Sequence, residues 1–444
     1  MKTSPPQNLK RTIGVFGLAC AVVNFTIGTG IFVLPALIAE NLGAAAIICF
    51  LICGLLIYLI ALCFAEVGSK VTTSGGTYAY IEAAFGPFAG FLANNVFWFG
   101  ACILSDAAVA NALSKTVGYF FPLLDSNAFR PLFFLLLFGG LAYINIRGAK
   151  NGMRLIMITT FAKLIPLILL IILGVGHISG KNLQWQHSFS VTDIGAATLI
   201  LFYAFLGIES AVTNSGEFKN PSRVVPLGIF SGLFIVLIIY VSIQLVTQGI
   251  LGSQLLSYKE APLAEVANRI FGYVGITIII IGTAVSILGA LSGAIMAIPR
   301  VLYAGARDGI LPRFLGRVHS KFVTPHFAII VYATFGYLFA VFGAFKQLVI
   351  LTTAATLLIY LGVVLATIKL RYKKTTSKEK GFTIPGGLTV PVLATIIIIW
   401  ILSHLSKEEI TGISIFLLIL SIIYFFVRRF KMKQVALIAG KPSE

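Results

Sequence analysis

Long apolar runs, each about the length of a membrane-crossing helix, alternate with short polar segments along this 444-residue chain. A helix of about 20 mainly apolar residues crosses the hydrocarbon core of a bilayer. The pattern therefore predicts an all-α polytopic membrane protein with about twelve transmembrane helices. The runs lie at approximately 13–38, 43–66, 88–121, 131–146, 154–176, 192–214, 226–250, 271–300, 326–344, 347–369, 389–404 and 411–427.

Two of these predicted helices, the first and the sixth, contain a polar interruption that includes glycine. The interruptions lie at residues 24–35 and 203–210. A helix in lipid cannot leave backbone groups unpaired, so an unwound stretch at membrane depth must line a cavity or be buried in protein. Paired breaks in corresponding helices of two repeats indicate a binding site near the middle of the membrane.

The order of the spans predicts two blocks of five helices, each opening with a broken helix, and a final pair. Because each block has an odd number of spans, the second block is inverted relative to the first. The predicted units are a tail at 1–12, a first five-helix repeat at 13–176, a loop at 177–191, a second, inverted repeat at 192–370, a loop at 371–388, helices 11 and 12 at 389–427 and a tail at 428–444.

The formal net charge of +18 first suggests a nucleic-acid partner, but the placement of the basic residues predicts otherwise. With a cytoplasmic N-terminus and alternating spans, most of the 33 lysines and arginines fall on the cytoplasmic side. This bias follows the positive-inside rule and places both termini in the cytoplasm. Basic loops beside an anionic leaflet account for the high charge, so we expect the lipid bilayer, and no nucleic acid, as a partner.

The remaining composition indicates neither a disulfide framework nor a metal centre. All five cysteines fall inside predicted spans without zinc-type pairing, and the five histidines are scattered over loops and span ends. We therefore expect no metal and no cofactor. Residues 1–11 are polar and are followed by a long apolar span without a small-residue cleavage site, which is not typical of a removable signal peptide.

The chemistry available at the two breaks suits a zwitterionic amino acid. An interrupted helix offers amides that attract an anion and carbonyls that attract a cation. Gly28 and Gly30 would let the backbone approach a carboxylate closely, and Thr29 adds a hydroxyl. The alternative is that both glycines serve close helix packing. The carbonyls predicted to face an ammonium group are those around Thr26, Tyr203 and Leu206.

Charged side chains are costly inside a membrane, which makes the three inside predicted spans functional candidates. Glu209 could take a proton or gate the site; the alternative is a structural acid bonded to exposed backbone. Lys163 could tie the first block to the broken helix in place of a metal ion and release a proton, or serve packing alone. Asp106, with Ser105, could contact the substrate side chain, or only cap or pair. Glu66, at a span end, is expected to lie near a loop.

Four motifs in order give the chain a family resemblance over its whole length. They are Gly-Thr-Gly-Ile-Phe at 28–32, Ser-Gly-Gly-Thr-Tyr-Ala-Tyr at 74–80 running into Phe-Gly-Pro-Phe at 85–88, Glu-Phe-Lys-Asn-Pro-Ser-Arg at 217–223 with Pro226, and Arg-Val-Leu-Tyr-Ala at 300–304 with Arg-Asp-Gly-Ile-Leu-Pro at 307–312. The chain resembles the amino acid-polyamine-organocation superfamily of permeases. The resemblance implies a leucine-transporter-like fold, alternating access, and a substrate whose amino group, usually with a carboxylate, is held by the two breaks.

Within that superfamily the chain resembles the bacterial arginine-agmatine antiporter group through Glu209 and residues 85–98. It departs from that group at three positions. Tyr203 replaces the usual tryptophan, Ala294 lies where an aromatic residue is expected, and the polar third-span position falls on Ser105 or Asp106. These departures put selectivity for a guanidinium group in doubt.

Lys163 instead resembles the fifth-helix lysine of proton-coupled, sodium-independent amino acid permeases, where the lysine fills the place of a sodium ion. We therefore expect a proton-linked, sodium-independent amino acid permease. The alternative is an exchanger of cationic amino acids or polyamines, which the two buried acids motivate. A channel would need a polar path through several spans, and an enzyme would need a nucleophile-base pair or a metal cluster; the predicted spans contain neither.

Overall fold

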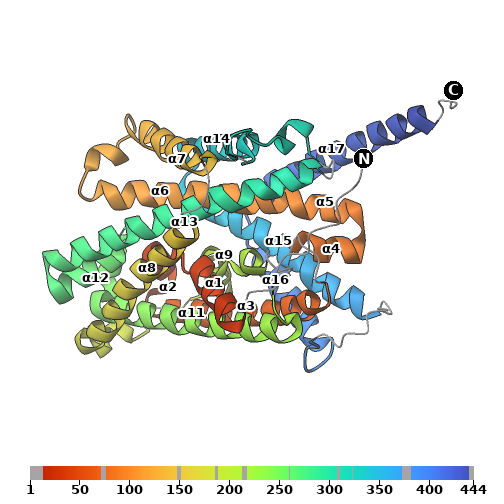
Figure 1. Cartoon of the computed structure of the whole chain (residues 1–444). Coiled ribbons are helices and arrows are strands. Elements are labelled where there is room, and N and C mark those ends of the chain that lie inside the picture. Colours follow the sequence, from red (N-terminus) through yellow and green to blue (C-terminus); the bar gives the residue numbers. More distant parts are fainter. Residues whose placement is uncertain are drawn as a thin grey trace.

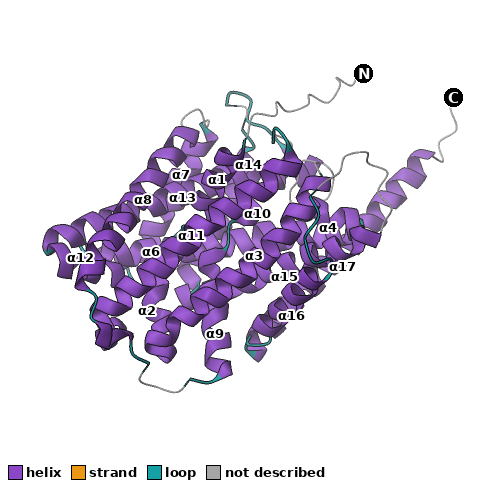
Figure 2. Ribbon diagram, turned by 90° about the horizontal axis from the view of Figure 1, so that it is seen from below, coloured by secondary structure: helices purple, strands orange, loops and turns teal. Residues whose placement is uncertain are grey.

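A computed structural model describes residues 14–71, 77–147, 152–185, 189–212, 218–259, 261–307, 311–322, 324–372 and 382–439 of the chain. Over these residues the secondary-structure elements are all helical, which confirms the predicted all-α class (Figure 2). The predicted tail at 1–12 and parts of the sequence motifs, at 74–76, 217 and 308–310, lie outside the described residues.

The helices follow the predicted apolar runs, with the first, third and sixth spans divided into shorter pieces. They are α1 (Val15–Thr26), α2 (Gly30–Leu42), α3 (Ala46–Lys70), α4 (Thr77–Phe85), α5 (Pro87–Asn95), η2 (Val96–Ile103), α6 (Leu104–Gly118), α7 (Arg130–Ile146), α8 (Gly152–Gly174), α9 (Val191–Phe202), η6 (Tyr203–Phe205), α10 (Ile208–Ala211), α11 (Pro221–Leu251), α12 (Pro262–Phe271), α13 (Tyr273–Arg307), α14 (His326–Phe342), α15 (Phe345–Tyr372), α16 (Thr389–Leu402) and α17 (Lys407–Ala439).

The lengths of these helices suit a multi-pass membrane protein. Among the described residues, seven helices are long and apolar enough to cross a membrane, and α1 with α2 gives an eighth span that is bent by 51° at its break. The other predicted runs coincide with shorter apolar helices, which are α7, the end of α8, α14 and α16. A helix shorter than the apolar core can be accommodated by local thinning of the bilayer.

Small residues let the helices around the first break approach closely. A Cβ at Gly228 or Gly232 of α11 would lie within 2.8 Å of the side chains of Leu18 and Val22 on α1. Gly54 of α3 meets Leu237 of α11 in the same way. Such contacts drive helix association in membranes, where burial of apolar surface does not. In Figure 1, α3 and α11 form the lower layer, α6, α7 and α14 form the upper layer, and α1 and α9 lie between them.

The third span contains a feature that hydropathy does not predict. Its middle, η2, is a π-helical segment between α5 and α6. A π-helical segment shifts the register of the side chains that follow it and is frequent at functional sites. Here it comes directly before Ser105 and Asp106, at the start of α6.

Candidate functional site

The first predicted break is present between α1, which ends at Thr26, and α2, which begins at Gly30. The two glycines of this break have different surroundings. A Cβ at Gly30 would lie 3.0 Å from the Cα of Ala204, whereas a Cβ at Gly28 would have no atom within 4 Å. Gly30 is therefore a close-packing glycine, and the backbone at Gly28 faces open space of the kind that an approaching ligand needs.

The second predicted break is also present, between α9 and α10. Gly207 has a φ of +135°, which L side chains rarely adopt. A Cβ there would lie 2.7 Å from the carbonyl carbon of Phe25. The two breaks therefore touch at two points, Gly207 against Phe25 and Gly30 against Ala204. The first and second breaks, about 180 residues apart in the sequence, therefore lie against each other as parts of one candidate binding site.

Lys163 of α8 binds the end of α1 directly. Its Nζ donates to the carbonyl oxygens of Asn24, at 2.6 Å, and Ile27, at 2.8 Å. The side chain is 3% exposed. The C-terminal end of a helix carries partial negative charge, so a cation is stabilised there. The lysine thus joins α8 to the end of α1.

Glu209 lies just inside α10 and is 6% exposed. The Gly207 amide donates to its Oε2 at 3.0 Å, and the hydroxyl of Tyr360 on α15 donates to the same oxygen. A carboxylate at a helix N-terminus is favourably placed relative to the helix dipole. These two donors are neutral, and one of them is a backbone amide at the break, as the structural alternative requires.

Ser105 and Asp106 are adjacent in the chain but point to different partners. The hydroxyls of Ser105 and Tyr203 lie 3.2 Å apart and share a hydrogen bond, which links α6 to the second break. The Oδ2 of Asp106 accepts a hydrogen bond from the hydroxyl of Tyr332 on α14 at 2.9 Å. The structure therefore brings Ser105 to the site and joins the Asp106 carboxylate to the upper layer of helices.

The remaining predicted site residues lie at the breaks with several of their carbonyls already paired. Thr26 and Thr29 are buried. The Thr26 carbonyl accepts from the Gly28 amide at 2.9 Å, and the Tyr203 carbonyl accepts from the Leu206 amide at 3.3 Å. A substrate ammonium group would share these carbonyls with donors from the chain itself.

Two tyrosines at the breaks were not found by the sequence reasoning. Tyr360 binds Glu209, and Tyr240 of α11 places its hydroxyl 2.8 Å from both the Thr26 and the Ala204 carbonyl oxygens. They are two of 15 tyrosines in a strongly apolar chain. The one available signal is general, since a buried tyrosine hydroxyl usually finds a hydrogen-bond partner.

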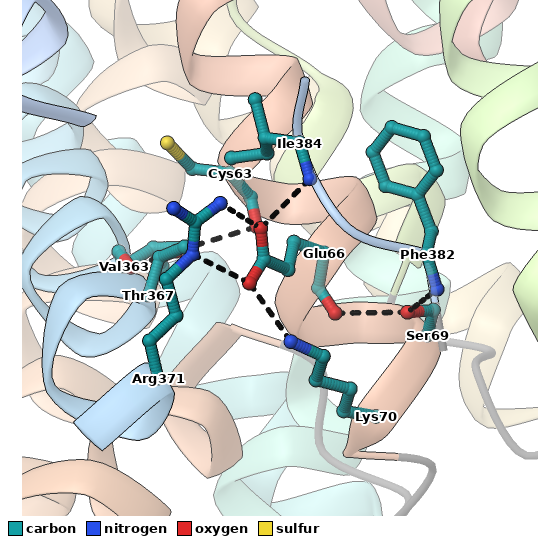
Figure 3. Close-up of polar contacts among 9 residues, drawn as sticks. All are labelled: Cys63, Glu66, Ser69, Lys70, Val363, Thr367, Arg371, Phe382 and Ile384. Carbon is teal, nitrogen blue, oxygen red and sulfur yellow. Dashed lines mark hydrogen bonds and ion pairs between the residues drawn. The ribbon is translucent and has the colours of Figure 1, made fainter. Parts of the chain in front are cut away.

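A separate ionic cluster lies at the C-terminal ends of α3 and α15 (Figure 3). Glu66 is at a span end, as expected, but it is only 1% exposed. It accepts hydrogen bonds from Lys70 Nζ and Arg371 Nε, both at 2.8 Å, and from the Ile384 amide at 3.0 Å. The amide of Phe382 donates to the Ser69 hydroxyl at 2.9 Å. The cluster fastens the segment before α16 onto the helix ends.

Several known transporters are similar to this chain in sequence. The serine/threonine exchanger SteT of Bacillus subtilis is 29% identical over 87% of this chain and 89% of its own length. The branched-chain amino acid permease BcaP of the same organism is 27% identical over 96% of this chain and 95% of its own length. The arginine/ornithine antiporter of Latilactobacillus sakei is 29% identical over 84% of this chain and 81% of its own length.

The family assignment rests on a match to nearly the whole chain. The sequence profile of the family described as amino acid permease matches residues 13–434, which include both helix breaks and Lys163. The relatives above are transporters by name and align with most of the chain. The chain therefore belongs to the amino acid permease family of the amino acid-polyamine-organocation superfamily.

Proposed function

We propose that the chain is a secondary active transporter that moves amino acids across the cell membrane by alternating access, linked to protons and independent of sodium. One observation carries the proposal. The two breaks are in contact, and the Lys163 ammonium group binds two carbonyls of the first break, those of Asn24 and Ile27. Family membership and the names of the relatives support amino acids as the substrate class.

The substrate backbone would dock between the breaks. Its carboxylate would approach the open backbone at Gly28, next to Thr29 and Gly30. Its ammonium group would share the carbonyls around Thr26, Tyr203 and Leu206 with the donors already there. Ser105 and Asp106, on the third span, would shape the preference for a side chain; the hydrogen bond from Ser105 to Tyr203 supports this for the serine.

Lys163 supports sodium independence. An unwound helix end at membrane depth needs positive charge or donors for its carbonyls. The ammonium group of Lys163 supplies both for the end of α1, in the place that the family resemblance gives to a sodium ion. Coupling to protons would fall to Lys163 and Glu209, which are both buried and both bound to the breaks.

The orientation and repeat organisation follow from the sequence. The bias of lysine and arginine would place both termini and the Glu66 cluster on the cytoplasmic side. The two five-helix units, at 13–176 and 192–370, would be inverted repeats whose broken helices meet at the site. Helices α16 and α17 would be the added pair.

A second candidate is an exchanger of cationic amino acids or polyamines. It is favoured by two buried acids near the breaks, Asp106 and Glu209, which accept hydrogen bonds from the neutral groups of Tyr332, Tyr360 and Gly207. Such acids could balance a positive substrate charge. The arginine/ornithine antiporter among the relatives supports the same possibility.

The test uses the purified full chain. A thermal-shift screen of all amino acids and common polyamines first identifies ligands, because a ligand that binds the native state raises the apparent stability. Uptake of the best ligand into proteoliposomes is then measured with an imposed pH gradient, in sodium and in choline buffer. We expect saturable uptake that follows the inward proton gradient in both buffers.

Three results would change the proposal. Uptake that occurs only when the vesicles contain a counter-substrate would favour the exchanger. A chain that binds and transports none of the amino acids would reject the transporter proposal itself, and an ohmic current in place of saturable flux would indicate a channel.

A further inference from the structure

Thr324 joins three segments of the chain at one end of the upper helix layer. Its carbonyl oxygen accepts hydrogen bonds from the amides of His319, at 2.8 Å, and His326, at 2.9 Å. Its hydroxyl donates to the carbonyl oxygen of Ile146 at 2.7 Å. Helix α7 ends at Ile146 and α14 begins at His326, and the two helices lie side by side (Figure 1). These bonds therefore hold the loop at 317–322 beside the ends of two neighbouring helices.

Three exposed cations lie close to Thr324 in this arrangement, and each is held over an aromatic ring. The pairs, with the distance from the cation to the ring centroid, are Arg147 with Tyr143 at 4.6 Å, Arg317 with Phe327 at 5.9 Å and Lys321 with Phe322 at 5.7 Å. A cation–π contact fixes the position of a cation and leaves N–H donors free. Among the described residues, the ion pairs of the protein include none of these three cations. Their charges are therefore available to an anion.

His319 adds a neutral donor to the same loop. Its Nδ1 atom accepts hydrogen bonds from the amides of Lys321, at 3.1 Å, and Phe322, at 3.4 Å. In a neutral imidazole ring, the nitrogen that accepts carries no proton, so Nε2 carries it. The two backbone bonds thus fix the ring with an Nε2–H group as its donor.

The helix ends place these groups at the surface of the membrane. Helices α7 and α14 follow apolar runs that are predicted to cross the bilayer, so residues at their ends lie at the depth of the lipid headgroups. Phe314 and Val318, close to the cations in the chain, are 43% and 42% exposed. Exposed apolar side chains beside basic residues are typical of a surface that rests against an anionic membrane.

We propose that Arg147, Arg317, Lys321 and His319 form one binding site for the headgroup of an anionic phospholipid. An arginine offers a phosphodiester two parallel N–H donors, and a lysine offers it a point charge. With the proposed orientation of the chain, the lipid belongs to the cytoplasmic leaflet. The site goes beyond the general attraction of basic loops to that leaflet, because one headgroup would join the end of α7 to the loop before α14.

The first test is a lipid titration of the purified full chain in a neutral detergent. The midpoint of thermal unfolding is followed while phosphatidylglycerol, phosphatidylcholine or inorganic phosphate is added at equal concentrations. We expect only phosphatidylglycerol to raise the midpoint, since a ligand of the native state stabilises it. In the double variant Arg317→Gln with Lys321→Gln, the half-saturating concentration should rise roughly thirtyfold, the effect of about 1 kcal/mol for each of two cations.

The matched control is the double variant Lys219→Gln with Arg223→Gln. It also removes one lysine and one arginine, both exposed and both on the side that the basic residues predict as cytoplasmic. This variant should respond to phosphatidylglycerol as the wild type does. Equal weakening in the two double variants would overturn the site in favour of a general effect of charge. An equal wild-type response to phosphatidylcholine, or to inorganic phosphate, would overturn a site for anionic lipid.

A measurement on the wild-type chain keeps the inference testable if the double variant does not fold. Phosphatidylglycerol with a photoreactive headgroup is irradiated with the protein in vesicles, and the labelled residues are mapped by mass spectrometry. We expect labels at 143–147 and 314–322 that unlabelled phosphatidylglycerol removes and phosphatidylcholine does not. Labels confined to other segments would contradict the site. Neither test depends on transport, so a chain that transports no amino acid would overturn the proposed function alone.

Discussion

Arg371 of α15 binds both carboxylate oxygens of Glu66 on α3 through its Nε and Nη2 atoms (Figure 3). Such paired hydrogen bonds are the strongest geometry for arginine and a carboxylate. Further along the same two helices, Phe64 packs edge-on against Tyr360, with centroids 5.4 Å apart, and Tyr360 binds Glu209. One side of α15 thus connects the second break to the ionic cluster at the helix ends.

Glu66→Gln should destabilise the protein. The substitution removes the negative charge that holds Arg371 and Lys70 side by side, and the glutamine cannot accept all the bonds that the carboxylate accepts. We expect a loss of roughly 1–3 kcal/mol, measured as a lower midpoint of thermal unfolding in detergent. Glu408→Gln is the control, because Glu408 is an exposed acid in the first turn of α17. Equal midpoints for the two variants would contradict a stabilising cluster.

Lys163→Ala should abolish pH-dependent uptake. The variant leaves the carbonyls of Asn24 and Ile27 without the ammonium group that now binds them. Uptake into proteoliposomes is measured while the outside pH is raised toward the inside pH. The wild type should slow as the inward proton gradient falls, and the variant should show a low, flat rate. An unchanged profile at every pH would remove Lys163 from the coupling mechanism.

Glu209→Gln separates the two roles that the sequence left open for this acid. A glutamine oxygen can accept from the Gly207 amide and from the Tyr360 hydroxyl as the carboxylate does, so the fold should be kept to within about 1 kcal/mol. If Glu209 couples transport to protons, the pH dependence of uptake disappears in the variant. If the residue is only structural, the pH profile of the variant matches that of the wild type.

The helices and both breaks were predictable because they depend on local sequence. Apolar length locates a span, and Gly28 and Gly207 mark where the helix cannot continue. The hydrogen-bond partners of the site residues were not predictable, because they come from distant segments of the chain. Glu209 and Tyr360 are 151 residues apart, and Glu66 and Arg371 are 305 apart. No local pattern identifies such pairs.

The hydrogen-bond partner of the Asp106 carboxylate was also not predictable from local sequence. Sequence placed Asp106 and Ser105 together on the third span, and in the structure both lie in the first turn of α6. The π-helical segment before them sets the direction of each side chain, and hydropathy carries no signal for it. The hydrogen bond from Tyr332 to Asp106 could therefore not be foreseen.

A pair of alanine substitutions distinguishes ligand approach from packing at the first break. Gly28 has open space where a Cβ would lie, so Gly28→Ala should fold with a stability within about 0.5 kcal/mol of the wild type. Its methyl group would fill the space proposed for the substrate carboxylate, and we expect uptake to fall at least about tenfold through a higher KM. Gly30→Ala places a methyl group 3.0 Å from Ala204 and should lower the thermal midpoint instead. Stability and KM are measured for both variants, and normal uptake by Gly28→Ala would place the substrate elsewhere.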